Sequence, residues 1–87
     1  MQKAEITNTH GETIESLKKA KTRYQEIPKS NTKITVIMMC LDGHGVLDIS
    51  RNLKISKTTV GRYIKRFNSG GLEELLTYIK STIEIYS

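Results

Sequence analysis

The chain is poor in the features that mark secreted, disulfide-linked or membrane-spanning proteins. It has a single cysteine, Cys40, so no disulfide can form within the chain. Its longest unbroken apolar run, 36–41, holds six residues, whereas a membrane-spanning helix needs about 20. The N-terminus lacks the apolar segment of a secretory signal peptide. We therefore expect no membrane partner and a cytoplasmic, reducing setting in which Cys40 is a buried thiol.

The sequence also lacks residue sets that carry catalysis or hold a metal. No Ser/His/Asp arrangement, glycine-rich phosphate loop or histidine pair is present. Cys40 and His44 are four residues apart, but a closed zinc site takes four ligands, and Gly43 is predicted to end the helix between them. The acids are scattered along the chain and do not suit a two-metal site: Asp42, Asp48, Glu73 and Glu74. We expect no enzymatic activity, no cofactor and no metal.

Positive charge, by contrast, is in excess. Lys and Arg number 14 against nine Asp and Glu, which gives a net charge of +5 and a pI near 9.5. This balance suits an anionic partner, either nucleic acid or an acidic membrane surface. With 87 residues the chain is near the lower limit for one core, so we predict a single domain. Its expected parts are a flexible lead-in at 1–8, a domain over 9–80 and a tail at 81–87.

Two short amphipathic patterns meet at residues 54–56 and organise the chain. The first has its apolar residues at Val46, Ile49 and Leu53. The second repeats them at the spacing i, i+3, i+4, i+7, which puts them on one side of a helix: Val60, Tyr63, Ile64 and Phe67. Ser56 can cap this helix by accepting from backbone N–H groups of its first turn. The arrangement predicts a helix-turn-helix over 45–68 with its second helix at 57–68.

The outward face of that second helix is predicted to be basic. Between Ser56 and Gly70 there are four Lys or Arg and no acid. Such a face can neutralise phosphates, and an arginine can pair with guanine in the major groove. The alternative is that this basic face is only solvated. The face belongs to the second helix of a turn-joined pair, however, and this favours double-stranded DNA as the partner. The candidate DNA-binding residues are Ser56, Lys57, Thr58, Thr59, Gly61, Arg62, Lys65 and Arg66.

These residues resemble a known family. The resemblance is carried by Gly45-Val46, Asp48-Ile49-Ser50, Leu53, Ile55-Ser56, Thr59-Val60, Arg66-Phe67 and Gly70-Gly71-Leu72. They are similar to the N-terminal helix-turn-helix domain of bacterial insertion-sequence transposases related to the Tc1/mariner group. The resemblance covers roughly residues 12–76 and is tightest over 45–72. It implies an all-α, homeodomain-like bundle of about four to five helices that binds DNA.

Two positions depart from the family pattern. Ser50 stands where the family has a small alanine, and serine is small enough for the same close helix approach. Lys54 stands where the family has a glycine in the turn. A positive φ there costs a non-glycine residue about 1 kcal/mol, so we expect a slightly altered turn.

Two helices are predicted before the helix-turn-helix. Thr9 and Glu12 match a capping box, and apolar residues then recur at helical spacing until Pro28, which should stop the helix. The basic side chains of this helix could meet a DNA backbone, but nearby acids favour a solvated face. Ser30 or Asn31 should cap the next helix.

This second helix, over about 32–42, is apolar most of the way round and should be deeply buried. Gly43 should end it. After residue 71, Leu72 begins a further amphipathic run. The residues at 82–86 alternate in a way that fits either a frayed helix or an edge strand.

Three functions fit these observations. The first is the DNA-binding module of a transposase-like protein without its catalytic domain, since a chain that ends at Ser87 is expected to be too short to include that domain. The second is a small stand-alone transcription regulator, dimeric on paired half-sites. The third is a basic helical module that binds an acidic protein. The turn-and-cap arrangement favours DNA, and we take the first function, associated with the nucleoid, as the primary expectation.

Overall fold

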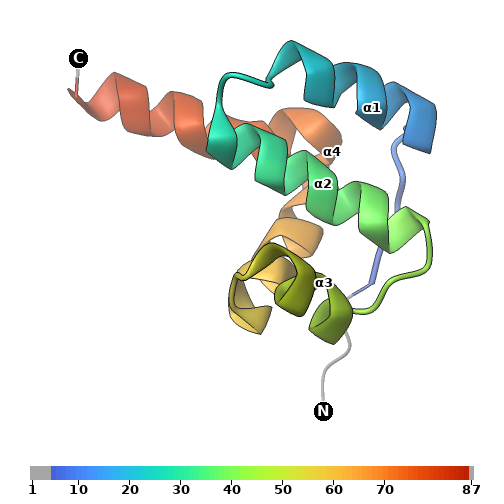
Figure 1. Ribbon diagram of the computed structural model, residues 1–87. Helices are drawn as coiled ribbons and strands as arrows, with labels where there is room; N and C mark the ends of the chain where they lie inside the picture. The colour runs from blue at the N-terminus through green and yellow to red at the C-terminus, as the bar shows by residue number, and fades with distance from the viewer. Residues whose placement is uncertain (1–4, 87) are drawn as a thin grey trace.

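The computed structural model describes the backbone of residues 5–86 and the side chains of residues 5–76. Four helices follow one another: α1 (Ile14–Arg23), α2 (Pro28–Leu41), α3 (Val46–Leu53) and α4 (Lys57–Tyr86). No strand occurs in this part of the chain, which confirms the all-α prediction. α2 is central and contacts each of the other helices, with α1 along one side and α3 on the other (Figure 1).

The core lies where these helices meet. Val60, Ile64 and Phe67 of α4 are at most 1% exposed, as their spacing predicts. The prediction that the second helix is deeply buried is confirmed at Ile34, Val36 and Ile37, which are 0% exposed, whereas residues 38–41 are half-buried. Among residues 5–76, the buried apolar residues are Leu17, Ala20, Ile34, Val36, Ile37, Ile49, Val60, Ile64, Phe67 and Leu75.

The start of α1 differs from the prediction. The helix is capped by Thr13, whose hydroxyl accepts from the backbone N–H of Ser16, while the Ser16 hydroxyl accepts from the Thr13 N–H. The predicted capping box of Thr9 and Glu12 is therefore wrong. These two residues instead close a turn, in which the Glu12 N–H donates to the Thr9 carbonyl over 2.9 Å. His10 inside that turn has a φ of 52°, which is incompatible with a right-handed helix.

The boundary between α1 and α2 also differs. α1 ends at Arg23, before Pro28 could stop it, and Pro28 is the first residue of α2. Proline suits this position because the first N–H groups of a helix have no intrahelical partner in any case. The predicted caps, Ser30 and Asn31, lie inside α2, and Ser30 is 3% exposed. The N-cap is Ile27, which provides no side-chain hydrogen bond.

Glycines end two helical stretches as the sequence indicates. Gly43 follows α2 with a φ of 98°, and its N–H donates to the Cys40 carbonyl. α4 is interrupted at Gly70 and Gly71, both of which have non-helical dihedral angles. Gly71, at φ 72° and ψ −158°, occupies a region that is almost exclusive to glycine. The first half of α4 therefore ends where the predicted recognition helix ends, and the chain continues helically to Tyr86.

The segment before α1 contacts the end of that first half. Asn68 accepts from the Thr7 N–H over 2.8 Å and donates to the Glu5 carbonyl over 2.9 Å. The His10 ring lies edge-on to Phe67, with 5.7 Å between ring centroids. Residues 5–8, which the sequence predicts to be part of a loose lead-in, thus pack along α4.

Candidate nucleic-acid interface

The turn between α3 and α4 sets the direction of the exposed helix. Lys54 has φ 56° and ψ 44°, so a lysine adopts the left-handed conformation that usually belongs to glycine. The Ser50 hydroxyl donates to the Ile55 carbonyl, and the Ile55 N–H donates back to the Ser50 carbonyl over 3.2 Å. Ile55 is half-buried against the core, between the two helices. Ser50 and Ile55 together hold the left-handed turn closed.

Ser56 caps α4 as predicted. Its hydroxyl accepts from the Thr59 N–H over 3.1 Å, and its carbonyl accepts from the Val60 N–H over 3.1 Å. The Ser56 and Thr59 hydroxyls also share a hydrogen bond of 2.8 Å. The cap fixes the first turn of α4, from which the basic face begins.

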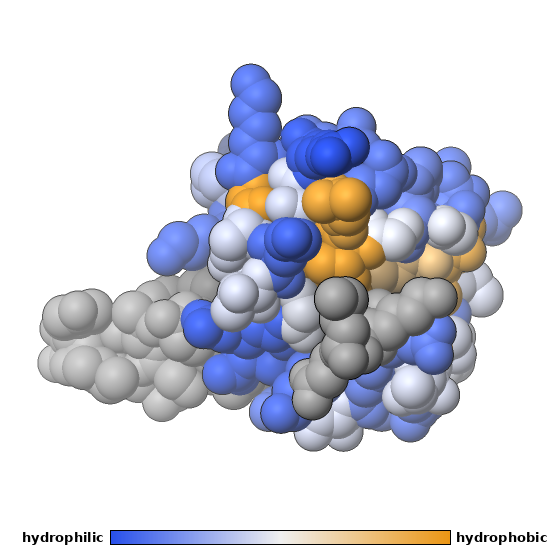
Figure 2. Space-filling view, turned by 90° about the horizontal axis from the view of Figure 1, so that it is seen from below, coloured by the Kyte–Doolittle hydropathy of each residue, from blue (hydrophilic) through white to orange (hydrophobic). Residues whose placement is uncertain are grey.

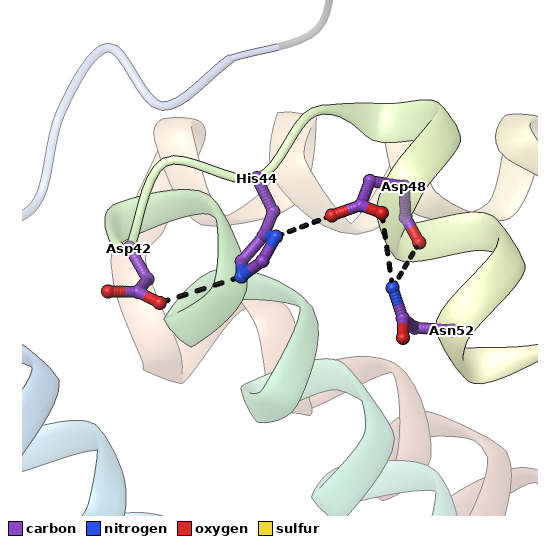
Figure 3. Close-up of polar contacts among 4 residues, drawn as sticks. All are labelled: Asp42, His44, Asp48 and Asn52. Atoms are coloured by element: carbon purple, nitrogen blue, oxygen red, sulfur yellow. Dashed lines mark hydrogen bonds and ion pairs between the residues drawn. The ribbon is translucent and has the colours of Figure 1, made fainter.

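The start of α3 is held by a polar network around His44 (Figure 3). The His44 ring lies between two carboxylates, with Nδ1 at Asp48 and Nε2 at 3.5 Å from Asp42. Asn52, one turn further along α3, donates to the Asp48 carbonyl over 2.8 Å. These contacts join the end of α2 to the first turns of α3, so they position the first helix of the pair.

The eight candidate residues share the outer side of α4 and its cap. Five of them are exposed: Ser56, Lys57, Thr58, Arg62 and Lys65. The other three are half-buried: Thr59, Gly61 and Arg66. None of the eight belongs to the core, so the predicted face is open to a partner.

The surroundings of this face are mostly polar. α3 and the first half of α4 lie on the lower side of the molecule in Figure 1, and the view from below in Figure 2 shows mostly hydrophilic side chains around an apolar area that extends from the centre toward the right. Leu47 of α3, at 49% exposure, is a large apolar side chain left to solvent. Such a surface suits a charged, hydrated partner better than an apolar one.

A basic pocket lies beside the candidate face. It has a volume of about 350 Å³ and is lined from α2 by Lys29 and Lys33, and from α4 by Thr59, Arg62, Tyr63 and Arg66. Three of the predicted residues thus line a concave site as well as the helix face. Lys29 and Lys33 were missed by the sequence reasoning, which expected the helix to begin at about residue 32, after Lys29, and assigned Lys33 no role. The signal available was their i, i+4 spacing, which places both on one side of α2.

Lys33 is the unusual member of this pocket because it is 2% exposed. Its ammonium nitrogen donates to the Leu75 carbonyl over 3.3 Å and lies 5.5 Å from the centre of the Tyr63 ring. Burial lowers the pKa of Lys33, and the charges of Arg66 and Lys29 lower it further. The side chain therefore joins α2 to both halves of α4 while it adds to a concentrated positive potential.

The basic side chains of α1 are arranged differently. Lys18, Lys19 and Arg23 are exposed and Lys21 is half-buried, and none of the four lines the pocket. α1 lies across α2 from α3 and the first half of α4 (Figure 1). The structure thus brings the basic residues of α4 together with the lysines at the start of α2, and it leaves the basic residues of α1 outside this group.

Other candidate chemistry gains no support from the described residues. Among them no group of three or more His, Cys, Asp or Glu could hold a metal ion. Within the same part of the chain, no helix has the length and apolar character needed to cross a bilayer. Cys40 is half-buried, and burial raises the pKa of its thiol to about 11, which makes it a poor nucleophile.

Comparison with known families supports a DNA-binding helix-turn-helix domain. A family model described as "Winged helix-turn helix" matches residues 33–81, more than half of the chain. The match spans α3, the turn, the first half of α4 and most of α2. The backbone of residues 5–86 has no strand, and after Gly71, where the family name would place a β-wing, the chain continues as the second half of α4. Neither the curated proteins nor the solved structures contained a match.

Proposed function

The chain belongs to the winged helix-turn-helix family, and we propose that it binds double-stranded DNA sequence-specifically, with residues 57–68 of α4 in the major groove. The observation that carries the proposal is the outer side of α4, where all eight candidate residues are exposed or half-buried beside a basic pocket. A major groove admits an α-helix, and its base edges differ for every base pair.

The side chains along α4 divide into two proposed roles. Arg62 is exposed at the middle of the face and can reach the acceptor atoms of guanine with two parallel hydrogen bonds. Lys65 and Arg66 lie one turn further on and act on phosphates, which contribute affinity with little sequence information. Gly61 leaves the surface of the helix low, which permits close approach of DNA.

We also propose that the domain is the DNA-binding module of a transposase-like protein. This assignment rests on the resemblance of residues 45–72 to the Tc1/mariner-related domain. A stand-alone regulator on paired half-sites is the competing role. Two measurements distinguish these roles. A stable dimer in sedimentation would support the regulator, while preferential binding to inverted terminal repeats would support the transposase module.

The central experiment is selection of bound duplexes from a random library, followed by anisotropy titrations with the selected and a scrambled sequence. We expect enrichment of one site and tighter binding to it than to the scrambled duplex. In parallel, duplex is added to isotopically labelled protein, and the backbone amides of residues 56–66 should shift first. Shifts concentrated on residues 18–23 instead would show that α1 is the binding helix and would contradict the proposal.

The module is further proposed to bind DNA without cutting or joining it. Incubation with supercoiled plasmid and magnesium or manganese provides the test. We expect the plasmid to stay intact. Specific cleavage that survives purification and disappears in Asp48→Asn or Glu73→Gln variants would establish an enzyme.

A further inference from the structure

The basic pocket between α2 and α4 is a second possible binding surface, in addition to the outer face of α4. Its walls come from two helices, with Lys29 and Lys33 on α2 facing Thr59, Arg62 and Arg66 on α4. Among the α4 residues whose side chains are described, up to residue 76, Arg62 alone is exposed and also lines the pocket. The pocket therefore adjoins the proposed groove-binding face.

Its charge favours an anion. Four of the six lining residues carry Lys or Arg side chains, and none of the six is acidic. Like charges held this close oppose one another: burial is the main cause of the lowered pKa of Lys33, and the nearby charges of Arg66 and Lys29 lower it further. An anion placed among these side chains would remove the repulsion and gain charge-assisted hydrogen bonds.

The geometry suits a small, multivalent acceptor. Lysines act as point charges, and arginines offer a planar set of donors that matches phosphate oxygens. Thr59 adds a hydroxyl at the pocket wall, in hydrogen-bond contact with the Ser56 cap. Because α4 is proposed to lie in the major groove, the phosphates that border the groove are the anions nearest to this pocket.

We propose that the pocket between α2 and α4 binds a phosphate group of the DNA strand that borders the groove, an inference that rests on the DNA-binding function proposed above. Lys29 and Lys33 then make α2 part of the DNA interface. The strand is held between the first turns of α2 and the first half of α4, which fixes the angle at which α4 enters the groove.

The test uses Lys29→Gln, since Lys29 is exposed and its loss leaves the core intact. Lys19→Gln on α1 is the matched control, because Lys19 is also exposed and lies outside the pocket. Loss of a phosphate contact should weaken binding to the selected and the scrambled duplex alike, by about fivefold, as for a solvent-exposed ion pair. It should also lower the slope of log K against log salt by about one. Lys19→Gln should match the wild type in both quantities.

The outcomes separate this inference from the general function. If the wild-type chain binds duplex, and Lys29→Gln and Lys19→Gln both match the wild type in affinity and salt slope, DNA binding holds and the phosphate site is wrong. If the wild-type chain binds no duplex, the proposed function and this inference fall together. Inorganic phosphate supplies the last arm. Saturable amide shifts at Lys33 and Thr59 with phosphate, without any salt-slope change in Lys29→Gln, would assign the pocket to a free anion and overturn the DNA assignment.

Discussion

The two sides of the first half of α4 differ in what they contribute. The inward side is built from Val60, Ile64 and Phe67, each at most 1% exposed. The outward side carries Lys57, Arg62 and Lys65, all exposed, together with hydroxyls and a glycine. The inward side joins the helix to the rest of the fold, while the outward side contributes little to folding and can be used for recognition. Changes on the two sides should therefore have separable effects.

The largest expected effect is on the inward side. Val60→Asp would bury an unpaired charge, at a cost of several kcal/mol against a total stability of about 5–10 kcal/mol for a domain of this size. We expect loss of cooperative melting by circular dichroism. Thr58→Asp, on the exposed side of the same turn, is the control and should melt like the wild type. A Val60→Asp protein that melted normally would show that the two sides are wrongly assigned.

On the outward side, Arg62→Ala should leave melting unchanged and weaken binding to the selected duplex by about 1–3 kcal/mol, because a bidentate contact to a base is lost. Binding to scrambled duplex should change less, and anisotropy titrations measure both. Lys18→Ala on α1 is the control and should bind as the wild type does. Equal losses of affinity for both duplexes would reassign Arg62 to phosphate contact alone.

Lys33 combines the properties of the two sides, since it is charged and yet buried. Lys33→Met should raise the free energy of unfolding at neutral pH by about 1–2 kcal/mol, because a desolvated charge is replaced by an apolar side chain of similar length. The lowered pKa of Lys33 in the folded state means that folding disfavours its protonated form. The wild type should therefore gain stability as pH rises through the lowered pKa toward the ordinary value of 10.5. Denaturant melts of the wild type and Lys33→Met from pH 7 to 10.5 should show that their difference in free energy of unfolding shrinks as pH rises. A difference that stays constant with pH would contradict this account.

The smallest expected effect concerns the turn that orients both sides. Lys54 has a positive φ, so Lys54→Gly should relieve strain and raise stability by about 0.5–1 kcal/mol, after the greater flexibility of glycine in the unfolded chain is deducted. Arg51→Gly, inside the right-handed α3, is the control and should lower stability by about 1 kcal/mol. Chemical denaturation resolves both changes. A loss of stability in Lys54→Gly would mean that the lysine side chain itself stabilises the turn.

The patterns along the chain were sufficient for the helix pair. The spacing of Val60, Ile64 and Phe67, the cap at Ser56 and the stop at Gly70 and Gly71 all follow local rules, because helical periodicity and capping depend on neighbours within a few residues. The same local rules failed before α2. α1 is capped by Thr13 and not by Thr9, and α2 begins at Pro28 after Ile27, whose side chain makes no capping hydrogen bond. A rule that looks for a capping side chain therefore misplaces the start of α2.

The tertiary structure alone decided which basic residues lie together. The sequence determined an all-α chain with a helix-turn-helix and a basic outer face on α4, since charge and periodicity are local properties. It could not show that Lys29 and Lys33 lie beside Arg62 and Arg66, because that pocket joins residues about 30 positions apart through the packing of α2 on α4. Nor could it show that Lys33 is buried, since the burial of a lysine depends on what packs around it.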